Sequence, residues 1–200
     1  MAPPLQTRLE PQSAHWPDQQ PHPSTGAYGI IITARDELGI VNFRGGSEQT
    51  LPIAKCFGTA LPATPNQFTV AGERMALWLS PDEYLLLLAD ADEAEFSRSA
   101  HALMKGQFFA LNTVSDAFCI YEVTGDKVRQ MLAKGISLDL HPVSFKPLCC
   151  AQTSLSHAAV TLICMADNRF RLICRTSFSD YLESWLKDAS IEFGYQLNRP

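Results

Sequence analysis

Charged residues are scarce in this sequence: they make up 18% of its 200 residues, against roughly a quarter in typical soluble domains. Apolar residues make up 46%, which excludes a disordered chain. The 16 Lys and Arg residues are outnumbered by 21 Asp and Glu residues, and the net charge of −5 excludes a basic nucleic-acid-binding protein. This shortage of charge raises the question of whether part of the apolar surface covers a partner rather than a core.

Long hydrophobic runs are also missing. No stretch approaches the roughly 18 apolar residues of a membrane-spanning helix, so we expect no membrane association. The N-terminal segment MAPPLQTRLEPQ lacks the apolar part of a secretory signal, and we expect a cytoplasmic chain. The six cysteines are therefore expected to be reduced and structural. Cys149 and Cys150 are adjacent in an expected strand, so their side chains should point to opposite faces.

The first 26 residues differ from the rest. They hold six of the 13 prolines and show no periodicity, so they are expected to form neither helix nor sheet. Two interpretations stand: a flexible terminus, or an extended arm that lies on a partner subunit with Trp16 as an anchor. Residues 27–200 are expected to form the folded domain, with two pseudo-repeated halves, about 27–114 and 115–200, as a possible subdivision.

From Tyr28 onward, apolar patterns predict strands and helices. Strands are expected at 29–34, 38–43, 74–79, 84–89, 108–114, 117–123, 150–155, 158–165 and 169–174, and helices at about 50–58, 92–105, 125–134 and 177–189. The first two strands are expected to form a hairpin, and short turns elsewhere indicate antiparallel pairing. The predicted fold class is α+β: a two-layer sandwich of mainly antiparallel sheets, with helices packed on one face.

Local signals predict the helix ends. Thr50 is expected to cap the first helix ahead of Pro52, and Thr124 to cap the third helix, which Gly135 should end. The last helix carries the strongest apolar stripe, at intervals of three and four residues, and it should pack into the core. The stripe consists of Phe178, Tyr181, Leu182, Trp185, Leu186 and Ala189.

Motifs that carry chemistry are absent: there is no glycine-rich dinucleotide or phosphate loop, no H-E-x-x-H and no G-x-S-x-G. A zinc site could be assembled from His141, Cys149, Cys150 and His157, but these residues lack the compact ligand pairs of such sites. Asp139 could orient His141 as a general base, or simply make a structural hydrogen bond. Ser156 and His157 are adjacent in sequence, which says little about a catalytic triad.

Acidic residues cluster between Arg74 and Arg98, where no Lys or Arg stands. One interpretation is a solvated turn and helix N-terminus, where acids suit the helix dipole. The other is an electrostatic docking patch. The cluster consists of Asp82, Glu83, Asp90, Asp92, Glu93 and Glu95.

Several local motifs together resemble one known family. They are ALWLSPDEYLL at 76–86, AKGISLDLHP at 133–142 followed by Phe145 and CAQT at 150–153, RTSF at 175–178 with WL at 185–186 and EFG at 192–194, and LPATPN at 61–66. The chain is similar, over about residues 51–194, to the gamma subunit of heterotetrameric sarcosine oxidase. It departs from the family pattern at Ile136, where cysteine is frequent, and at Leu148, where glycine is common.

The resemblance implies a complex that oxidatively demethylates sarcosine to glycine, forms hydrogen peroxide and passes the one-carbon unit to tetrahydrofolate. It implies alpha, beta and delta subunits as partners. It places FAD, FMN, NAD, zinc and tetrahydrofolate on those subunits, with no catalytic, cofactor-binding or metal-binding residue on this chain. The implied fold is that of the folate-binding aminomethyltransferases. Asp139, His141, Gln152 and Thr153 are then interpreted as residues that hold a loop against a strand or a neighbour.

Two other functions stay open. The first is a standalone folate-binding protein of the aminomethyltransferase superfamily, including the iron–sulfur-repair type. That type carries K-G-C-[YF]-x-G-Q-E, whereas Lys134 and Gly135 are followed here by Ile136. The second is a small independent enzyme that uses His141 or His157.

Overall fold

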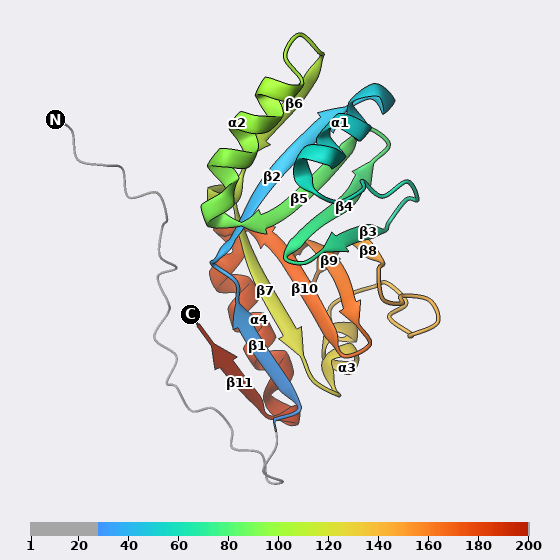
Figure 1. The fold of residues 1–200 in the computed structure, drawn as a ribbon. Coiled ribbons are helices and arrows are strands. Elements are labelled where there is room, and N and C mark those ends of the chain that lie inside the picture. The colour runs from blue at the N-terminus through green and yellow to red at the C-terminus, as the bar shows by residue number, and fades with distance from the viewer. Residues whose placement is uncertain (1–27, 200) are drawn as a thin grey trace, which may run out of the picture.

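Two β-sheets form the framework of the protein in the computed structural model, which describes residues 28–199 (Figure 1). The six-stranded sheet has the order β11-β1-β7-β10-β9-β8 and the five-stranded sheet the order β3-β4-β5-β2-β6. The first contains β1 (Ile30–Ala34), β7 (Phe118–Thr124), β8 (Cys150–Leu155), β9 (Ala158–Ala166), β10 (Arg169–Arg175) and β11 (Tyr195–Asn198), and the second contains β2 (Leu38–Gly45), β3 (Phe68–Ala71), β4 (Arg74–Ser80), β5 (Glu83–Ala89) and β6 (Phe109–Thr113).

Within the described residues, four α-helices cover the sheets, two on one face of each. Those on the five-stranded sheet are α1 (Ser47–Phe57) and α2 (Glu93–Leu103), and those on the six-stranded sheet are α3 (Val128–Ala133) and α4 (Ser179–Ser190). Each helix pair closes its own apolar core. The predicted α+β class, with mainly antiparallel sheets and helices on one face, is confirmed; β1 and β11 form a parallel pair. No helix of the described residues is long and apolar enough to cross a bilayer.

The other faces of the two sheets pack against each other. Because side chains alternate along a strand, Phe170, Leu172 and Cys174 of β10 face the helices, while Ile173 joins the core between the sheets. Leu77 and Leu87 reach the same inter-sheet core from the five-stranded sheet. The result is one continuous body with three apolar cores, two under helices and one between the sheets.

The expected hairpin between residues 29–34 and 38–43 is wrong. β1 pairs with β7 and β11, whereas β2 pairs with β5 and β6 in the other sheet. Both strands lie between two neighbours in their sheets, and an apolar run of this length does not by itself specify which strands it pairs with. Residues 35–37 are thus a crossover between the sheets, and β1 pairs with strands of the second half of the sequence.

The predicted helix ends were partly wrong. α1 begins at Ser47, with Gly46 as N-cap, so Thr50 lies inside the helix and its hydroxyl donates to the Ser47 carbonyl at 2.7 Å. α3 begins at Val128, and Thr124 is the last residue of β7. Thr50 shows the physical cause of the first error: Thr hydroxyls bond to nearby backbone groups in several local settings, of which the N-cap is only one.

Gly135 does not end α3 in a left-handed conformation. A Cβ at this position would lie 2.4 Å from Cζ2 of Trp185, so the glycine makes room for the indole ring. The stripe on α4 packs into the core as predicted, with Leu182, Leu186 and Ala189 buried and Trp185 partly buried. Phe178 is the exception, because it precedes α4 and is 39% exposed. The N-terminal arm and its Trp16 lie outside the described residues.

Candidate functional site

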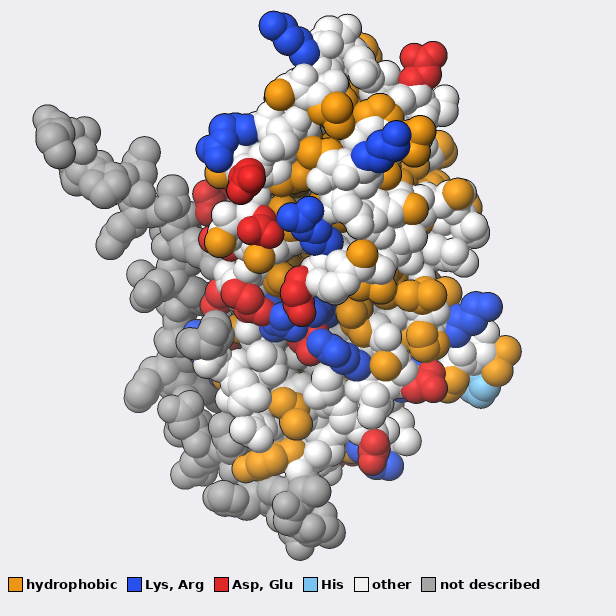
Figure 2. Space-filling model, in the orientation of Figure 1, with side chains coloured by type: hydrophobic (Ala, Val, Ile, Leu, Met, Phe, Trp, Pro, Cys, Tyr) orange, Lys and Arg blue, Asp and Glu red, His pale blue; other side chains and the backbone are white. Residues whose placement is uncertain are grey.

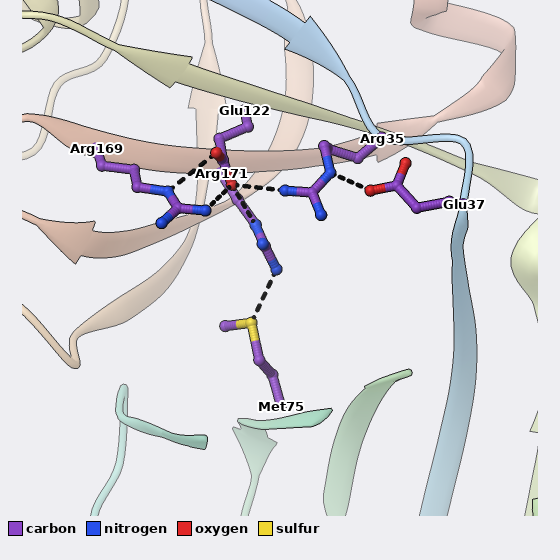
Figure 3. A network of polar contacts seen from close by, with 6 residues as sticks. All are labelled: Arg35, Glu37, Met75, Glu122, Arg169 and Arg171. Atoms are coloured by element: carbon purple, nitrogen blue, oxygen red, sulfur yellow. Dashed lines mark hydrogen bonds and ion pairs between the residues drawn. The ribbon is translucent and has the colours of Figure 1, made fainter. Parts of the chain in front are cut away.

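A cluster of charged side chains lies where the two sheets meet (Figure 3). The carboxylate of Glu122 on β7 accepts hydrogen bonds from three arginines: Arg35 Nη1 at 3.0 Å, Arg169 Nη2 at 3.0 Å and Arg171 Nε at 2.8 Å. Arg35 is also paired with Glu37. From the same cluster, Arg171 Nη1 reaches across to the sulfur of Met75 on β4, at 3.1 Å. The cluster therefore links the six-stranded sheet to the five-stranded one.

Strand geometry explains why these groups converge. Glu122 and Arg171 stand directly opposite each other in the β7–β10 pair. Arg169 lies two residues before Arg171 and so points to the same face of the sheet. The Arg171 side chain is only 4% exposed and that of Glu122 11%. Burial raises the pKa of the Glu122 carboxyl, but the hydrogen bonds and charges of Arg169 and Arg171 outweigh it and hold the pKa below its usual value. A carboxylate held in this way stays ionised and is a weak base.

A second carboxylate is held in a similar way at the other side of β7. Glu183 on α4 lies 2.8 Å from Lys187 Nζ and 2.6 Å from Arg199 Nη2. Its pKa is lowered, because these two partners outweigh the effect of burial. The Tyr121 hydroxyl donates to the same carboxylate at 3.3 Å, and burial together with this negative charge raises the pKa of Tyr121.

These two carboxylates predict a loss of stability in acid. Their pKa values are lower in the folded chain than the ordinary 4.5, so the unfolded chain binds protons first as the pH falls. The stabilisation is complete above about pH 4.5 and is lost progressively below it, at up to ~1.4 kcal/mol per pH unit for each group. Urea unfolding at a series of pH values measures this slope. Glu37→Gln, which keeps both buried carboxylates, should show the same slope, and a flat profile between pH 5 and 3 would contradict the assignment.

Residues of the family motifs at 76–86, 150–153 and 175–178 meet in a groove between the two sheets. This inter-sheet groove has a volume of about 460 Å³, and Glu83, Gln152, Thr153 and Arg175 line it. The Gln152 side-chain amide on β8 donates to the Leu79 carbonyl on β4 at 3.1 Å, so it ties one sheet to the other. Glu83 accepts a hydrogen bond from the Asn42 amide at 2.9 Å. Arg175 stacks over the ring of Phe118, at 5.1 Å from the ring centroid.

The residues considered for zinc do not come together. Cys150 is buried in the inter-sheet core, where its thiol donates to the Gln67 carbonyl at 3.3 Å, while Cys149 packs against the helix-covered core of the six-stranded sheet. Their side chains thus point to opposite faces, as predicted. His141 and His157 are exposed. Within residues 28–199, no three His, Cys, Asp or Glu side chains are placed to hold a metal ion.

The two candidate histidine pairs make structural contacts. Asp139 accepts from the backbone N–H of His141 at 2.9 Å and, with a bond from Ser144, has a lowered pKa, so it shapes the loop instead of orienting the imidazole. The Tyr181 hydroxyl donates to the Ser156 hydroxyl at 2.9 Å, and Ser156 has a positive φ of 52° in a tight turn. Neither arrangement presents a base to a nucleophile.

The acidic cluster is split between the two ends of β5. Asp82 precedes that strand and Glu83 is its first residue, and the two face Arg44 at 4.0 and 3.5 Å. Asp92 lies beyond its other end, 3.3 Å from Arg74. A strand of this length separates its ends by roughly 20 Å, so the acids do not form one patch. They serve a turn and the region of the α2 N-terminus, in line with the first of the two interpretations.

The Glu122 cluster was missed from the sequence, although a signal exists. Glu122 is the single charged residue within FCIYEVT of β7, and Arg169 and Arg171 alternate with apolar residues in RFRLICR of β10. A lone charge inside a strand that is otherwise apolar must either reach solvent or find a partner, because an unpaired buried charge costs several kcal/mol. Charges of opposite sign in two such strands are therefore candidates for one buried cluster.

Comparisons with known proteins agree with this architecture and with the motifs. The model of a family described as "Sarcosine oxidase, gamma subunit family" matches residues 49–192. The sarcosine oxidase subunit gamma of Corynebacterium sp. (strain U-96) is 31% identical over 153 residues, which cover 74% of this chain and 72% of that protein. The subunit of the same name from Arthrobacter sp is 28% identical over 149 residues, with the same two coverages.

Solved structures show the same fold. A chain of the heterotetrameric sarcosine oxidase from Corynebacterium sp. U-96, in complex with pyrrole 2-carboxylate, matches with a TM-score of 0.77 and 23% identity over 82% of this chain and 85% of that one. The glycine cleavage system aminomethyltransferase T from Bartonella henselae matches with a TM-score of 0.63 and 10% identity, covering 86% of this chain and 48% of that one. The predicted aminomethyltransferase-like fold is confirmed. By its sequence and its fold, the chain belongs to the sarcosine oxidase gamma subunit family.

Proposed function

We propose that this chain is the non-catalytic gamma subunit of a heterotetrameric sarcosine oxidase and that it supports the assembly of the complex with alpha, beta and delta subunits. The family match over residues 49–192 supports the proposal. The complex would oxidise sarcosine to glycine, release hydrogen peroxide and transfer the one-carbon unit to tetrahydrofolate. FAD, FMN, NAD, zinc and tetrahydrofolate would be bound by the other subunits.

The non-catalytic role is supported by the pairing of the buried carboxylates, which are held by neighbouring side chains of the chain itself. Glu122 is engaged by three arginines, and Glu183 by a lysine, an arginine and a tyrosine. Catalytic acids and bases need a pKa near the working pH and access to substrate. The pKa values of both buried carboxylates are shifted away from neutrality, which suits structural ion pairs.

Exposed apolar side chains support a role in assembly. Phe108, between α2 and β6, is 97% exposed, Val143 is 79% exposed and Leu51 on α1 is 63% exposed. Figure 2 shows hydrophobic side chains gathered on the part of the molecule that carries α1, with few charges among them. Such side chains gain free energy when a partner covers them, at about 25 cal/mol per Å² of apolar surface.

Co-expression of this chain with the alpha, beta and delta subunits tests the proposal. The complex should form with the chain and should be lost or unstable without it. His141→Ala, His157→Ala and Cys149→Ala should leave the turnover per assembled complex unchanged. A general acid or base contributes about 10²–10⁴-fold to a rate, so a loss of that size in an assembled complex would contradict the non-catalytic role.

A standalone folate-binding protein is the second candidate, favoured by the likeness of the fold to aminomethyltransferase T. Calorimetric titration of the purified chain with tetrahydrofolate separates the two functions. Tight binding to the isolated chain supports the second candidate. Absence of binding, together with co-purification of the four subunits, supports the first.

The exposed ring of Phe108 gives a sharper test of assembly. Phe108→Glu should leave the thermal unfolding of the isolated chain unchanged, since the ring is 97% exposed, and should reduce co-purification with the other subunits. Ala102→Glu is the matched control, because it adds the same charge to exposed surface nearby without removing a large apolar group. Equal co-purification of both variants would show that the α2–β6 end does not contact a partner.

A further inference from the structure

Two cysteines face each other across neighbouring strands of the six-stranded sheet. Cys119 on β7 and Cys174 on β10 are directly opposed in the antiparallel register. Cα atoms of opposed residues in such a pair are about 4.5 or 5.5 Å apart, and both separations fall within the range of about 4.4–6.8 Å that disulfides span. The backbone geometry therefore already suits a bond between the two sulfur atoms.

The two thiols also interact with each other. The Cys119 thiol donates to the Cys174 carbonyl at 3.6 Å, and both side chains belong to the helix-covered core of the sheet. A hydrogen bond between the thiols raises the pKa of Cys119, together with burial, and lowers the pKa of Cys174 against the opposing effect of burial. Cys174 is thus the thiol of the pair that ionises more readily, which suits it to attack an oxidised Cys119.

One of the two sulfur atoms is within reach of a small oxidant. Cys119 is half-buried and lines a cavity of about 260 Å³, with Arg35, Tyr121 and Glu183 also in its wall. Cys174 is 1% exposed, and Cys119 is the cysteine of the pair that lines this cavity. A molecule of the size of hydrogen peroxide fits this cavity.

We propose that Cys119 and Cys174 form a redox modification site, which hydrogen peroxide closes to a cross-strand disulfide within the chain. The Cys119 sulfur attacks one peroxide oxygen because it is the sulfur that the cavity reaches. Its proton passes to the departing hydroxide as the O–O bond breaks, which gives a sulfenic acid and one water. The Cys174 sulfur then displaces the hydroxyl group from Cys119, forming the S–S bond and a second water. The two thiol protons leave in the two waters, and the peroxide is reduced. The source of peroxide, though not the chemistry of the pair, rests on the proposed function.

Closure of this bond would protect Cys119. A sulfenic acid without a neighbouring thiol is oxidised further to sulfinic acid, which is not reduced by ordinary thiols. Here the partner sulfur stands opposite, so the sulfenic acid is consumed before a second peroxide arrives. The strands are already paired along their length, so the bond joins segments that need not move.

Peptide mapping of the full chain after treatment with hydrogen peroxide tests the proposal. Trypsin should place Cys119 in the peptide of residues 106–127 and Cys174 in the peptide of residues 172–175. The expected result is a cross-linked pair of these two peptides, two hydrogens lighter than their sum, which a reducing agent separates. Recovery of both peptides uncrosslinked, with Cys119 either still a thiol or oxidised to sulfinic acid, would overturn the proposal.

A second pair of neighbouring cysteines, Cys149 and Cys164, provides an internal control. The Cys164 N–H donates to the Cys149 carbonyl at 2.9 Å, but the Cys164 sulfur contacts the Arg129 guanidinium at 3.6 Å. Cys149 and Cys164 fall in the same tryptic peptide, residues 135–169, because Lys146 precedes a proline. Cys149→Ala should leave the cross-link between residues 106–127 and 172–175 intact, and Cys119→Ala should abolish it. A cross-link that survives Cys119→Ala would assign the oxidation to other cysteines and contradict the site.

Discussion

Replacing Glu122 by glutamine should destabilise the chain by about 3–5 kcal/mol, the cost of breaking a buried ion pair by removing one partner. The substitution preserves the size of the side chain but leaves three guanidinium groups converging on a neutral amide. The unpaired charge costs most at Arg171, because its side chain is 4% exposed and cannot turn to solvent. Urea unfolding, with the midpoint and the slope measured separately, gives the change in the free energy of unfolding.

Two variants of the same cluster serve as controls. Glu37→Gln removes a carboxylate that is 50% exposed, and Arg169→Gln removes a guanidinium that is 43% exposed. Each should cost no more than about 1 kcal/mol, as exposed ion pairs do. If Glu122→Gln costs as little as these two, water reaches the cluster and it does not join the sheets.

Replacing Trp185 by alanine should destabilise the chain by about 3–5 kcal/mol, the usual cost of deleting a large aromatic ring from a core. The indole packs against the helix-covered core of the six-stranded sheet and fills the space above Gly135. Thermal and urea unfolding of Trp185→Ala measure the loss. A cost below 1 kcal/mol would mean that the ring contributes little to packing.

Gly135→Ala tests the same contact from the other side. The added methyl group would lie 2.4 Å from the indole, so overpacking should cost about 1–3 kcal/mol. In the Trp185→Ala background the ring is gone, and the same methyl group should cost little or even fill part of the cavity. The two changes should therefore be strongly non-additive. Simple additivity would contradict the direct contact between Gly135 and Trp185.

Elements with a strong pattern of their own were predictable from the sequence, and pairings between distant segments were not. The stripe on α4 and the apolar run of β5 depend on neighbours in sequence, which a linear pattern contains. The partner of β1 depends on Tyr195–Asn198 and on Phe118–Thr124, and no periodicity in Ile30–Ala34 encodes that choice. The short strands β3 and β11, of four residues each, were missed for the related reason that their pairing defines them.

The same distinction applies to the sites: local features were predictable from the sequence, and features that need distant segments were not. Vicinal Cys149 and Cys150 point to opposite faces, as strand geometry requires. The Glu122 cluster needs the register between β7 and β10, which brings together residues 49 positions apart in sequence. Family motifs identified Glu83, Gln152 and Arg175, yet only the packing of one sheet on the other shows that all three line one groove.

The pairing of β1 with β11 determines the order in which the two sheets can be completed during translation. The five-stranded sheet uses only Leu38–Thr113, so its strands are all available when little more than half of the chain has left the ribosome. β1 is made earlier still, but it must wait for β7 and then for β11, which ends at Asn198. Until Tyr195–Asn198 emerge, one edge of β1 stays unpaired and open to other strands. Removal of Tyr195–Asn198 would therefore expose one edge of a strand that was made much earlier in translation.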